Sequence, residues 1–344
     1  MAATIKDVAA RAGVASSTVS RVLAGSPRIS PATQERVRQA MRELRYHPNA
    51  IARSLARRST RTLGLIISRP VEVAFANPFF AEVVRGIGAV LHQEGYHLLL
   101  ASAPDLKSER STCLGLLRGG RVDGVILTRT FVSDRLVHDL HSERFPFVVI
   151  GRVTDDIPVN WVNNDNVAVG AMAVEHLLEQ GHRRVALIGG PLELVVSVDR
   201  REGYWQALRR AAIQPRPEYE ADGSFTREGG YRATAALLAQ PERPSAIFAI
   251  DDAMALGAWQ YCRDRGVAVP GDVAIVGVND DPITAMLNPP LSTVRIPIFD
   301  LGAAAAKTLV EVLGKRADAP RQVILPSELL VRGSSDRPRS ERTT

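Results

Sequence analysis

Residues 4–25 read TIKDVAARAGVASSTVSRVLAG, and this stretch decides how the amino-terminal part of the chain folds. The apolar residues of its first half are spaced at i, i+3, i+4 and i+7, as on one face of a short helix: Ile5, Val8, Ala9 and Ala12. Gly13 follows, where a tight turn can use a positive φ. A second short helix is predicted over 16–23. Two short helices joined by a glycine turn are typical of a helix-turn-helix unit.

A third helix is predicted directly after this stretch. Ser30 is a favourable N-cap residue, and Pro31 suits the first helical position. The apolar stripe has the same spacing as before: Val37, Ala40, Met41 and Leu44. In a three-helix domain of this kind, the first residues of the second helix face the base edges of the DNA major groove.

Ser16, Ser17 and Arg21 are therefore candidates for reading a DNA sequence. Serine can donate to or accept from several bases, and arginine suits guanine. Two alternatives stay open at this point. In the first, Ser16 serves only as a helix N-cap. In the second, Arg21 contacts only phosphate and no base.

The positive charge of the chain is concentrated in the same region. The first 62 residues hold twelve Lys and Arg against three Asp and Glu, a net charge of +9, whereas the rest of the chain carries −3. A folded basic module of this size points to a polyanionic partner, nucleic acid above all. A basic arm that only aids solubility would lack the apolar periodicity seen here.

The segment YHPNAIARSLARR, residues 46–58, predicts a short hinge helix. Pro48 ends the preceding helix, Asn49 can cap a new one, and Ile51 and Leu55 share a face at i, i+4. A helix this short has only marginal stability alone. We therefore expect it to form only when it is paired, for example with the same helix of a second subunit on duplex DNA. Leu55 then has the character of an apolar wedge for the minor groove. An ordinary basic linker is the alternative.

From Leu63 onward, short apolar runs alternate with amphipathic stretches. This alternation predicts parallel sheets with helices on both faces. There are enough units for two doubly wound halves, with a ligand crevice at the carboxyl ends of the strands. A break near Trp161 divides the halves, and a late strand over 291–294 is expected to cross back. The predicted strands are 63–67, 97–100, 124–127, 147–150, 185–188, 246–250, 273–276 and 323–325, with helices near 80–94, 108–118, 133–141, 166–180, 200–212, 227–239, 252–265 and 300–313.

Residues 4–56 closely resemble the headpiece of the LacI/GalR family of bacterial transcription regulators, without a gap through the helices. The remainder resembles the family in NPFF (77–80), RxxGY (200–204), DDxMALG (251–257) and VPGDVAIVGVNDDP (269–282). The resemblance implies a two-lobed core like that of periplasmic binding proteins, with a small effector between the lobes. It also implies a set of DNA-binding residues: Ser16, Ser17, Thr18, Arg21, Arg28, Asn49 and Leu55.

Candidate effector-binding residues lie near strand ends and helix starts. Aromatic rings can stack on a sugar face, and an arginine fork suits paired hydroxyls or a carboxylate. Each of these residues also has an alternative role. One phenylalanine could pack in the core, and Arg200 could form a surface ion pair with Glu202 or Asp199. The Asp and Asn residues could be helix N-caps. Asn279 stands where the family usually has Asp. The full set is Phe79, Phe80, Arg152, Asp165, Arg200, Phe225, Asp251 and Asn279, and the role of Phe225 rests on the resemblance alone.

We expect a helix-turn-helix domain over 1–48, a hinge helix and linker over 49–61, a core over 62–333 and a disordered tail over 334–344. Within the core, the first lobe is expected over about 62–160 and 292–320, and the second over about 161–291 and 321–333. The tail has no apolar heptads, which favours a homodimer over a tetramer.

Other classes of protein fit less well. No signal peptide and no apolar run of roughly 18 residues are apparent, and Cys113 and Cys262 lie outside any CxxC, which indicates a reducing cytoplasm. The chain lacks GxGxxG, GxxxxGK[ST] and GxSxG, so we expect no catalytic residues, cofactor or metal. The sequence predicts a repressor that binds pseudo-palindromic double-stranded operator DNA and a sugar-like effector. A purine- or nucleotide-responsive regulator, a solute-binding protein and an α/β enzyme are the alternatives.

Overall fold

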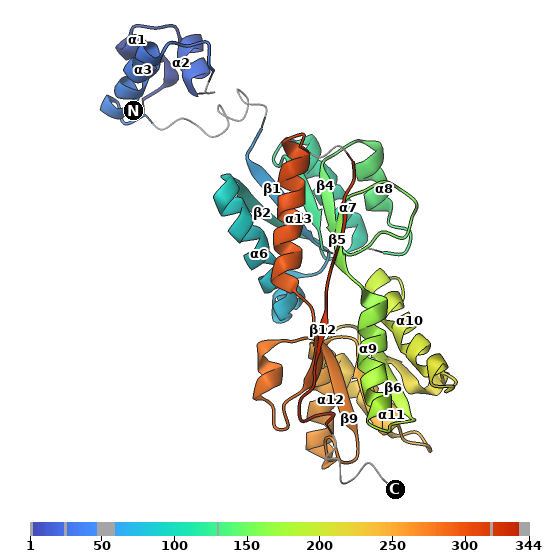
Figure 1. The fold of residues 1–344 in the computed structure, drawn as a ribbon. Helices are drawn as coiled ribbons and strands as arrows, with labels where there is room; N and C mark the ends of the chain where they lie inside the picture. The colour runs from blue at the N-terminus through green and yellow to red at the C-terminus, as the bar shows by residue number, and fades with distance from the viewer. Residues whose placement is uncertain (1–2, 24–25, 47–58, 129–130, 317–318, 337–344) are drawn as a thin grey trace.

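The computed structural model describes residues 3–23, 26–46, 59–128, 131–316 and 319–336 (Figure 1). Asn49 and Leu55 lie outside the described residues, so the roles predicted for them stay predictions.

The amino-terminal domain has the three expected helices, α1 (Ile5–Ala12), α2 (Ser16–Leu23) and α3 (Pro31–Glu43). Thr4 and Asp7 form a capping box at the start of α1, and Gly13 ends that helix with a φ of 65°. Ser30 caps α3 ahead of Pro31. A small core holds the helices together, and its fully buried members are Val8, Val19 and Val37.

The first lobe is a six-stranded parallel sheet in the order β11–β5–β4–β3–β1–β2. Helices α6 and α13 cover one face and share its core, and α7 and α8 cover the other (Figure 1). The strands are β1 (Thr62–Ile67), β2 (His97–Ser102), β3 (Gly124–Leu127), β4 (Phe147–Ile150), β5 (Trp161–Asn164) and β11 (Gln322–Leu325). The helices are α5 (Val71–Ala76), α6 (Pro78–Glu94), α7 (Leu106–Arg118), α8 (Arg135–Ser142) and α13 (Ile298–Leu313).

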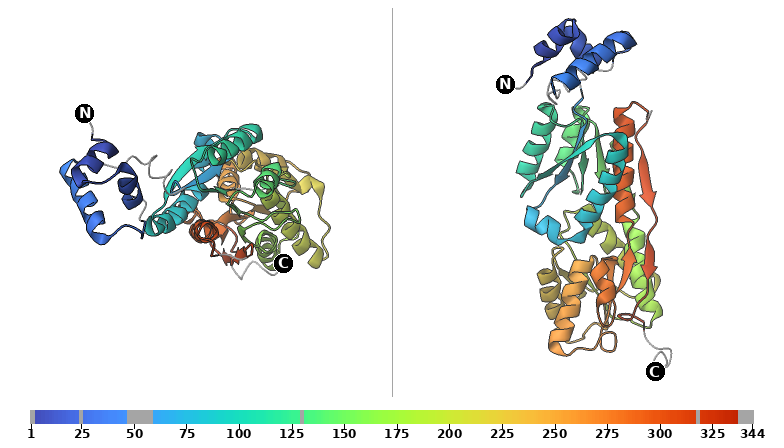
Figure 2. Two further views of the ribbon diagram at one scale, coloured as in Figure 1. Left: turned by 90° about the horizontal axis from the view of Figure 1, so that it is seen from above. Right: turned by 90° about the vertical axis from the view of Figure 1, so that its left-hand side faces the viewer.

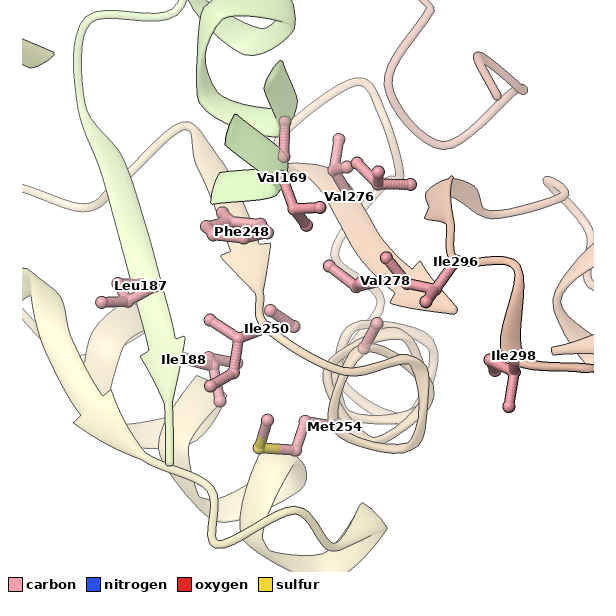
Figure 3. Close-up of a cluster of buried hydrophobic side chains, with 14 of the residues drawn as sticks. Val169, Leu187, Ile188, Phe248, Ile250, Met254, Val276, Val278, Ile296 and Ile298 are labelled. Carbon is pink, nitrogen blue, oxygen red and sulfur yellow. The ribbon is translucent and has the colours of Figure 1, made fainter. Parts of the chain in front are cut away.

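The second lobe repeats this plan in the order β12–β10–β9–β8–β6–β7, with only β12 antiparallel to its neighbour. Its core, in Figure 3, combines strand residues such as Phe248 with Val169 and Met254 from the covering helices. The strands are β6 (Val185–Gly189), β7 (Glu220–Asp222), β8 (Ala246–Ala249), β9 (Ala274–Asn279), β10 (Ser292–Arg295) and β12 (Glu328–Leu330). The helices are α9 (Asn166–Glu179), α10 (Val195–Arg210), η1 (Pro217–Tyr219), α11 (Arg227–Leu238), α12 (Asp252–Arg265) and η2 (Pro282–Met286).

The structure corrects the predicted division of the core into lobes. β5, which begins at Trp161, belongs to the first sheet, and β10 belongs to the second. β11 then returns to the first sheet, although residues 321–333 were all expected in the second lobe. The chain thus crosses between the lobes three times, after β5, β10 and β11. Periodicity identifies a buried strand but not its partner, because strand pairing is a long-range property.

The predicted disordered tail is also wrong at its beginning. Ser334 and Ser335 are fully buried. The Ser334 hydroxyl accepts from the Ser292 amide at 2.8 Å and donates to the Ile275 carbonyl at 2.6 Å, and the Ser335 hydroxyl lies 2.7 Å from Nε2 of His176. The composition predicts disorder because serine is polar. A polar side chain can nevertheless be buried when the fold supplies its hydrogen-bond partners.

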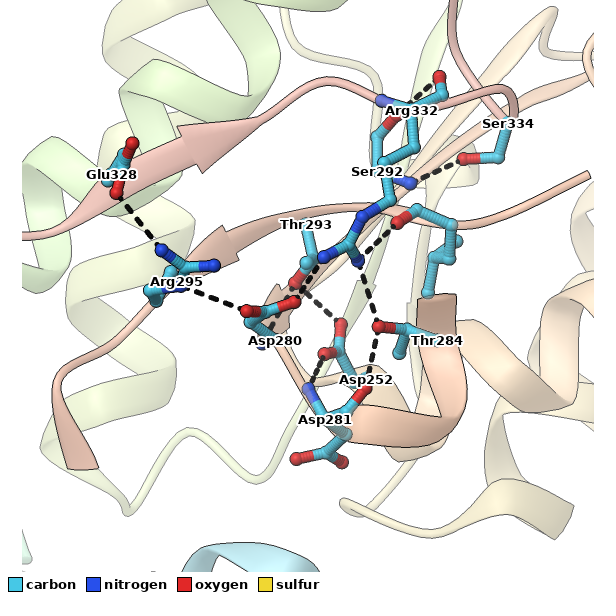
Figure 4. Close-up of polar contacts among 11 residues, drawn as sticks. Asp252, Asp280, Asp281, Thr284, Ser292, Thr293, Arg295, Glu328, Arg332 and Ser334 are labelled. Atoms are coloured by element: carbon cyan, nitrogen blue, oxygen red, sulfur yellow. Dashed lines mark hydrogen bonds and ion pairs between the residues drawn. The ribbon is translucent and has the colours of Figure 1, made fainter. Parts of the chain in front are cut away.

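Buried acidic residues lie near the hydrogen bonds that hold Ser334 (Figure 4). Arg332 donates to Asp280 at 2.6 Å, while Asp252 accepts from the Thr293 hydroxyl at 2.8 Å and from the Asp281 amide at 2.9 Å. Burial raises the pKa of Asp252 to about 7. Burial and the neighbouring carboxylate of Asp252 raise the pKa of Asp281 to about 8.

The crossing of α6 and α13 provides a test of packing. An added Cβ at Gly86 would lie 2.0 Å from the Phe299 carbonyl oxygen, so we expect Gly86→Ala to lower the free energy of unfolding by about 2–3 kcal/mol. Nothing lies within 4 Å of a Cβ at Gly88 in the same helix. Gly88→Ala should therefore be neutral or stabilising by up to about 1 kcal/mol. Urea denaturation compares the two variants, and equal effects would contradict the close helix crossing.

The buried acids predict a pH dependence of stability. A carboxyl group whose pKa is higher in the folded protein than in the unfolded chain binds its proton more tightly when folded. The free energy of unfolding should therefore fall as the pH rises from about 4 to the folded pKa, and then level off. We expect Asp281→Asn, which removes the carboxyl with a pKa of about 8, to reduce this fall. The variant should be more stable than the wild type by about 1–2 kcal/mol at pH 8.5.

Urea denaturation at pH 5, 7 and 8.5 measures this difference. Asp264→Asn, at an exposed position on α12, is the control and should leave the pH profile unchanged. Parallel profiles for Asp281→Asn and the wild type would show that Asp281 does not titrate in this window.

Candidate functional site

The surface of α2 presents the predicted DNA-binding residues. Ser17 and Arg21 are exposed, Ser16 and Thr18 are half-buried, and the next residue, Val19, points into the domain core. The helix begins at Ser16, and the Ala15 carbonyl accepts from the Thr18 and Val19 amides at 2.9 and 3.2 Å. Ala15 therefore occupies the capping position, which leaves the Ser16 hydroxyl outside that role.

The arginines of this domain fall into two groups. Arg11 pairs with Glu43 at 2.5 Å, and Arg42 pairs with Glu35 at 2.7 Å. Arg21 and Arg28 are exposed and form no ion pair with any described residue. Their charge is therefore not balanced by protein carboxylates and is available to a polyanion.

A carboxylate connects the chain that follows the hinge segment to the first lobe. Asp123, just before β3, accepts hydrogen bonds from the Ser59 hydroxyl at 2.5 Å, the Thr60 amide at 2.6 Å and the Arg61 amide at 2.9 Å. The Thr60 hydroxyl adds a fourth at 2.8 Å. We call residues 59–61 with Asp123 the Asp123 clasp.

A cavity of about 880 Å³, including its opening to solvent, lies between the lobes at the carboxyl ends of strands from both sheets. Seven of the eight predicted effector residues line it: Phe79, Phe80, Arg152, Arg200, Phe225, Asp251 and Asn279.

Asp165 is the exception and corrects the prediction. Its carboxylate caps α9 by accepting from the Ala168 amide at 2.9 Å, and the residue is exposed. The asparagines on either side of it face the cavity instead. The sequence WVNNDN offered a signal in its repeated amides, but which of them points inward depends on where β5 ends.

Arg200 is buried and held by neutral partners. Its Nε donates to Oδ1 of Asn166 at 2.9 Å, and its Nη1 donates to the Ile250 carbonyl at 2.5 Å. Asn166 is held in turn by Asn163 and Asn164, each at 3.1 Å. Burial lowers the pKa of Arg200 to about 10, so the side chain remains a cation at neutral pH. The alternative of a surface ion pair is therefore wrong.

Asp251 joins the lobes through its carboxylate. One oxygen caps α12 by accepting from the Ala253 amide at 2.8 Å. The other accepts from the side-chain amides of Asn279 at 3.1 Å and of Asn77, in the first lobe, at 3.3 Å. Burial raises the pKa of Asp251, and the Arg200 cation opposes this shift.

Arg152 does not add a free charge to the cavity. It follows β4 and forms a two-pronged ion pair with Asp199 of α10, with a distance of 2.7 Å from Nε to Oδ2. Asp199 is buried and Arg152 is partly exposed, and the pair joins the two lobes.

Aromatic and aliphatic side chains supply the rest of the lining. Phe79 and Phe80 meet edge to face at 5.4 Å, and Phe80 belongs to the core, as expected for one of the two. Phe225 approaches from the second lobe. The apolar start of α10 adds Leu194, Val195 and Val196. Several further lining residues were not predicted from the sequence: Arg69, Asn77, Thr128, Asn163, Asn164, Asn166 and Asp199.

Among the described residues, no cluster of His, Cys, Asp and Glu is arranged to hold a metal ion. No described helix combines the length and the apolar character that a membrane span requires.

Comparisons with known proteins agree with this arrangement. Residues 4–49 match the model of bacterial regulatory proteins of the lacI family, and residues 174–335 match the periplasmic binding protein-like domain. The regulator CelR of Thermobifida fusca is 37% identical over 334 residues, which are 96% of this chain and 98% of CelR. The repressor CytR of Escherichia coli K12 is 34% identical over 338 residues, 97% of this chain and 96% of CytR.

Solved structures give the same result. A complex of CelR with cellobiose has a TM-score of 0.76 at 36% identity and covers 96% of this chain and 99% of its own. The Lac repressor dimer bound to operator and the anti-inducer ONPF has a TM-score of 0.84 at 28% identity, with coverage of 97% and 99%. With relatives above 30% identity along nearly its whole length, the chain belongs to the LacI family of bacterial regulatory proteins.

Proposed function

We propose that this protein is a repressor whose affinity for operator DNA is set by a sugar or sugar derivative bound in the cavity between the lobes. As a member of the LacI family it is a DNA-binding transcription regulator rather than an enzyme. One observation carries the proposal: both lobes line the cavity. A ligand that contacts both lobes must change the free energy of the closed arrangement relative to an open one.

The lining favours a sugar as the effector. Asn163, Asn164 and the fork of Arg200 offer donors and acceptors for several hydroxyl groups, and Phe79 offers a ring face for a sugar to stack on. The relative CelR has been solved with cellobiose, which supports the same ligand class here. A purine is the competing ligand, and binding measurements distinguish the two.

The Asp123 clasp offers a route from the cavity to DNA. It fastens residues 59–61, which follow the hinge segment, to the sheet of the first lobe. A rotation of that lobe therefore moves the chain that leads to the DNA-binding domain. Because coupling is reciprocal, DNA must change effector affinity by the same factor.

The DNA side of the proposal uses the exposed face of α2. Ser16, Ser17 and Arg21 read the major groove and Arg28 lies close to it. Leu55, which lies outside the described residues, is the residue proposed to open the minor groove. A cytoplasmic homodimer would place two such domains on half-sites about one helical turn apart. The Lac repressor has been solved as a dimer bound to operator, which supports this assembly.

Arg21→Ala tests the role of α2. If Arg21 contacts a base, the substitution should weaken binding to a preferred duplex, obtained by selection from random sequence, by about 1–3 kcal/mol. Binding to random duplex should change much less. Arg42→Ala is the matched control, since Arg42 is already paired with Glu35. Fluorescence anisotropy at fixed salt measures both, and an equal loss on random DNA would reduce Arg21 to a phosphate contact.

One variant in the cavity, Arg200→Ala, and one in the clasp, Asp123→Ala, test the regulatory mechanism. Calorimetry of the full chain against sugars, sugar acids and nucleosides first identifies a ligand. Arg200→Ala should then weaken its binding at least tenfold, because a charged hydrogen-bond donor is lost (about 1.5–3 kcal/mol). Asp123→Ala should retain ligand affinity but lose most of the ligand's effect on operator binding. Binding of nucleosides alone, or full ligand affinity in Arg200→Ala, would defeat the sugar hypothesis. Unchanged regulation in Asp123→Ala would defeat the proposed route.

A further inference from the structure

The charged side chains that line the cavity comprise three arginines and only two carboxylates. The charged lining residues are Arg69, Arg152, Asp199, Arg200 and Asp251. Arg152 and Asp199 neutralise each other in their ion pair. Asp251 is the strongest attractive charge acting on Arg200, and both are buried. With three arginines against two carboxylates, the lining carries a net positive charge. Arg200 donates its hydrogen bonds to Asn166 and to the Ile250 carbonyl, which leaves Arg69 as the arginine of the lining that is open to a ligand.

Asp251 does not serve as a direct partner for Arg69. Its charge does attract Arg69, but its two oxygens already accept hydrogen bonds from Ala253, Asn77 and Asn279. Within the described parts of the chain, the Arg69 guanidinium donates no hydrogen bond and forms no ion pair. Burial accordingly lowers the pKa of Arg69, since the cation is partly removed from water without a carboxylate beside it.

Arg69 is nevertheless held in place from the opposite lobe. It follows β1 in the first lobe, and its guanidinium carbon lies 5.3 Å from the centre of the Phe225 ring in the second. Gly190 makes room for that ring, because a Cβ there would lie 2.4 Å from it. A guanidinium that stacks on an aromatic ring uses its face and leaves its in-plane N–H donors open.

We infer that the effector carries an anionic group, a carboxylate or a phosphate monoester, which Arg69 binds through these in-plane donors. This inference rests on the proposed function, because it assigns a chemical class to the sugar in the same cavity. One negative charge would neutralise the lining, and a planar fork suits the paired oxygens of either anion. Since Arg69 and Phe225 belong to different lobes, such a ligand would favour the closed arrangement.

Matched ligands test the charge directly. Glucose, galactose and ribose are each compared with the corresponding sugar acid and monophosphate, alongside cellobiose with cellobionic acid, a set of nucleosides and inorganic phosphate. Calorimetry of the full chain should find at least one acid or phosphate that binds ten times more tightly than its neutral parent. The acid and phosphate arms identify which anion is recognised, and inorganic phosphate shows whether the sugar is needed.

Substitutions then assign the preference to Arg69. Arg69→Gln should lower the ratio of anion affinity to neutral-parent affinity at least tenfold, and Arg69→Lys should retain part of that ratio. Arg209→Gln, at an exposed arginine of α10 outside the cavity, should retain all of it.

The outcomes separate the two hypotheses. If neutral sugars bind as tightly as their anions, or if Arg69→Gln keeps the preference, the inference is wrong and the proposed function stands. If only nucleosides or inorganic phosphate bind, or if no member of the set binds, the proposed sugar-responsive function itself fails.

Discussion

Three crossings of the chain between the lobes, after β5, β10 and β11, constrain the rest of the core. Each sheet is completed by a strand that comes from, or leads to, the other lobe, so neither lobe is a continuous stretch of sequence. In the right-hand view of Figure 2, the red segment with β11 and β12 runs along one side of both lobes. Connections along one side allow the lobes to rotate relative to each other more easily than to separate. The carboxyl ends of both sheets consequently remain opposed, and the ligand cavity lies between them.

Two polar contacts bridge the cavity, which suits an interface that must open and close. Asn77 reaches Asp251, and Arg152 reaches Asp199, in each case from the first lobe to the second. These groups can be hydrated when the lobes separate, whereas an apolar interface of the same size would resist opening.

The structure also explains why an Asn at position 279 is favourable. Asn279 donates to Asp251 at 3.1 Å, and an Asp at 279 would place two carboxylates at that distance.

Periodicity and capping residues were sufficient to predict most of the helices and strands, because both are local properties of the sequence. The short helix α5 and the strands β5, β7 and β12 were not predicted. Periodicity and capping also did not predict the sheet to which β5 and β10 belong, since burial makes such strands alike whichever neighbour they pair with. The same limit applies to the cavity. Seven residues of the predicted site line it, but Asp165 points to its own helix, and Arg69 showed no local signal. The direction of a side chain at the end of a strand follows from tertiary structure, which a single sequence does not contain.

The placement of the Asp123 clasp fits the proposed route from the ligand cavity to the DNA-binding domain. Asp123 immediately precedes β3, which lies beside β1 inside the six-stranded sheet, so the carboxylate belongs to the rigid part of the first lobe. Its four hydrogen bonds hold residues 59–61, and β1 begins at the next residue. The chain that enters the core therefore moves with the lobe as one body. The cavity lies at the carboxyl end of β1 and the clasp at its amino end, so under the proposed function a rotation of the first lobe around a ligand would also move the chain held by the clasp.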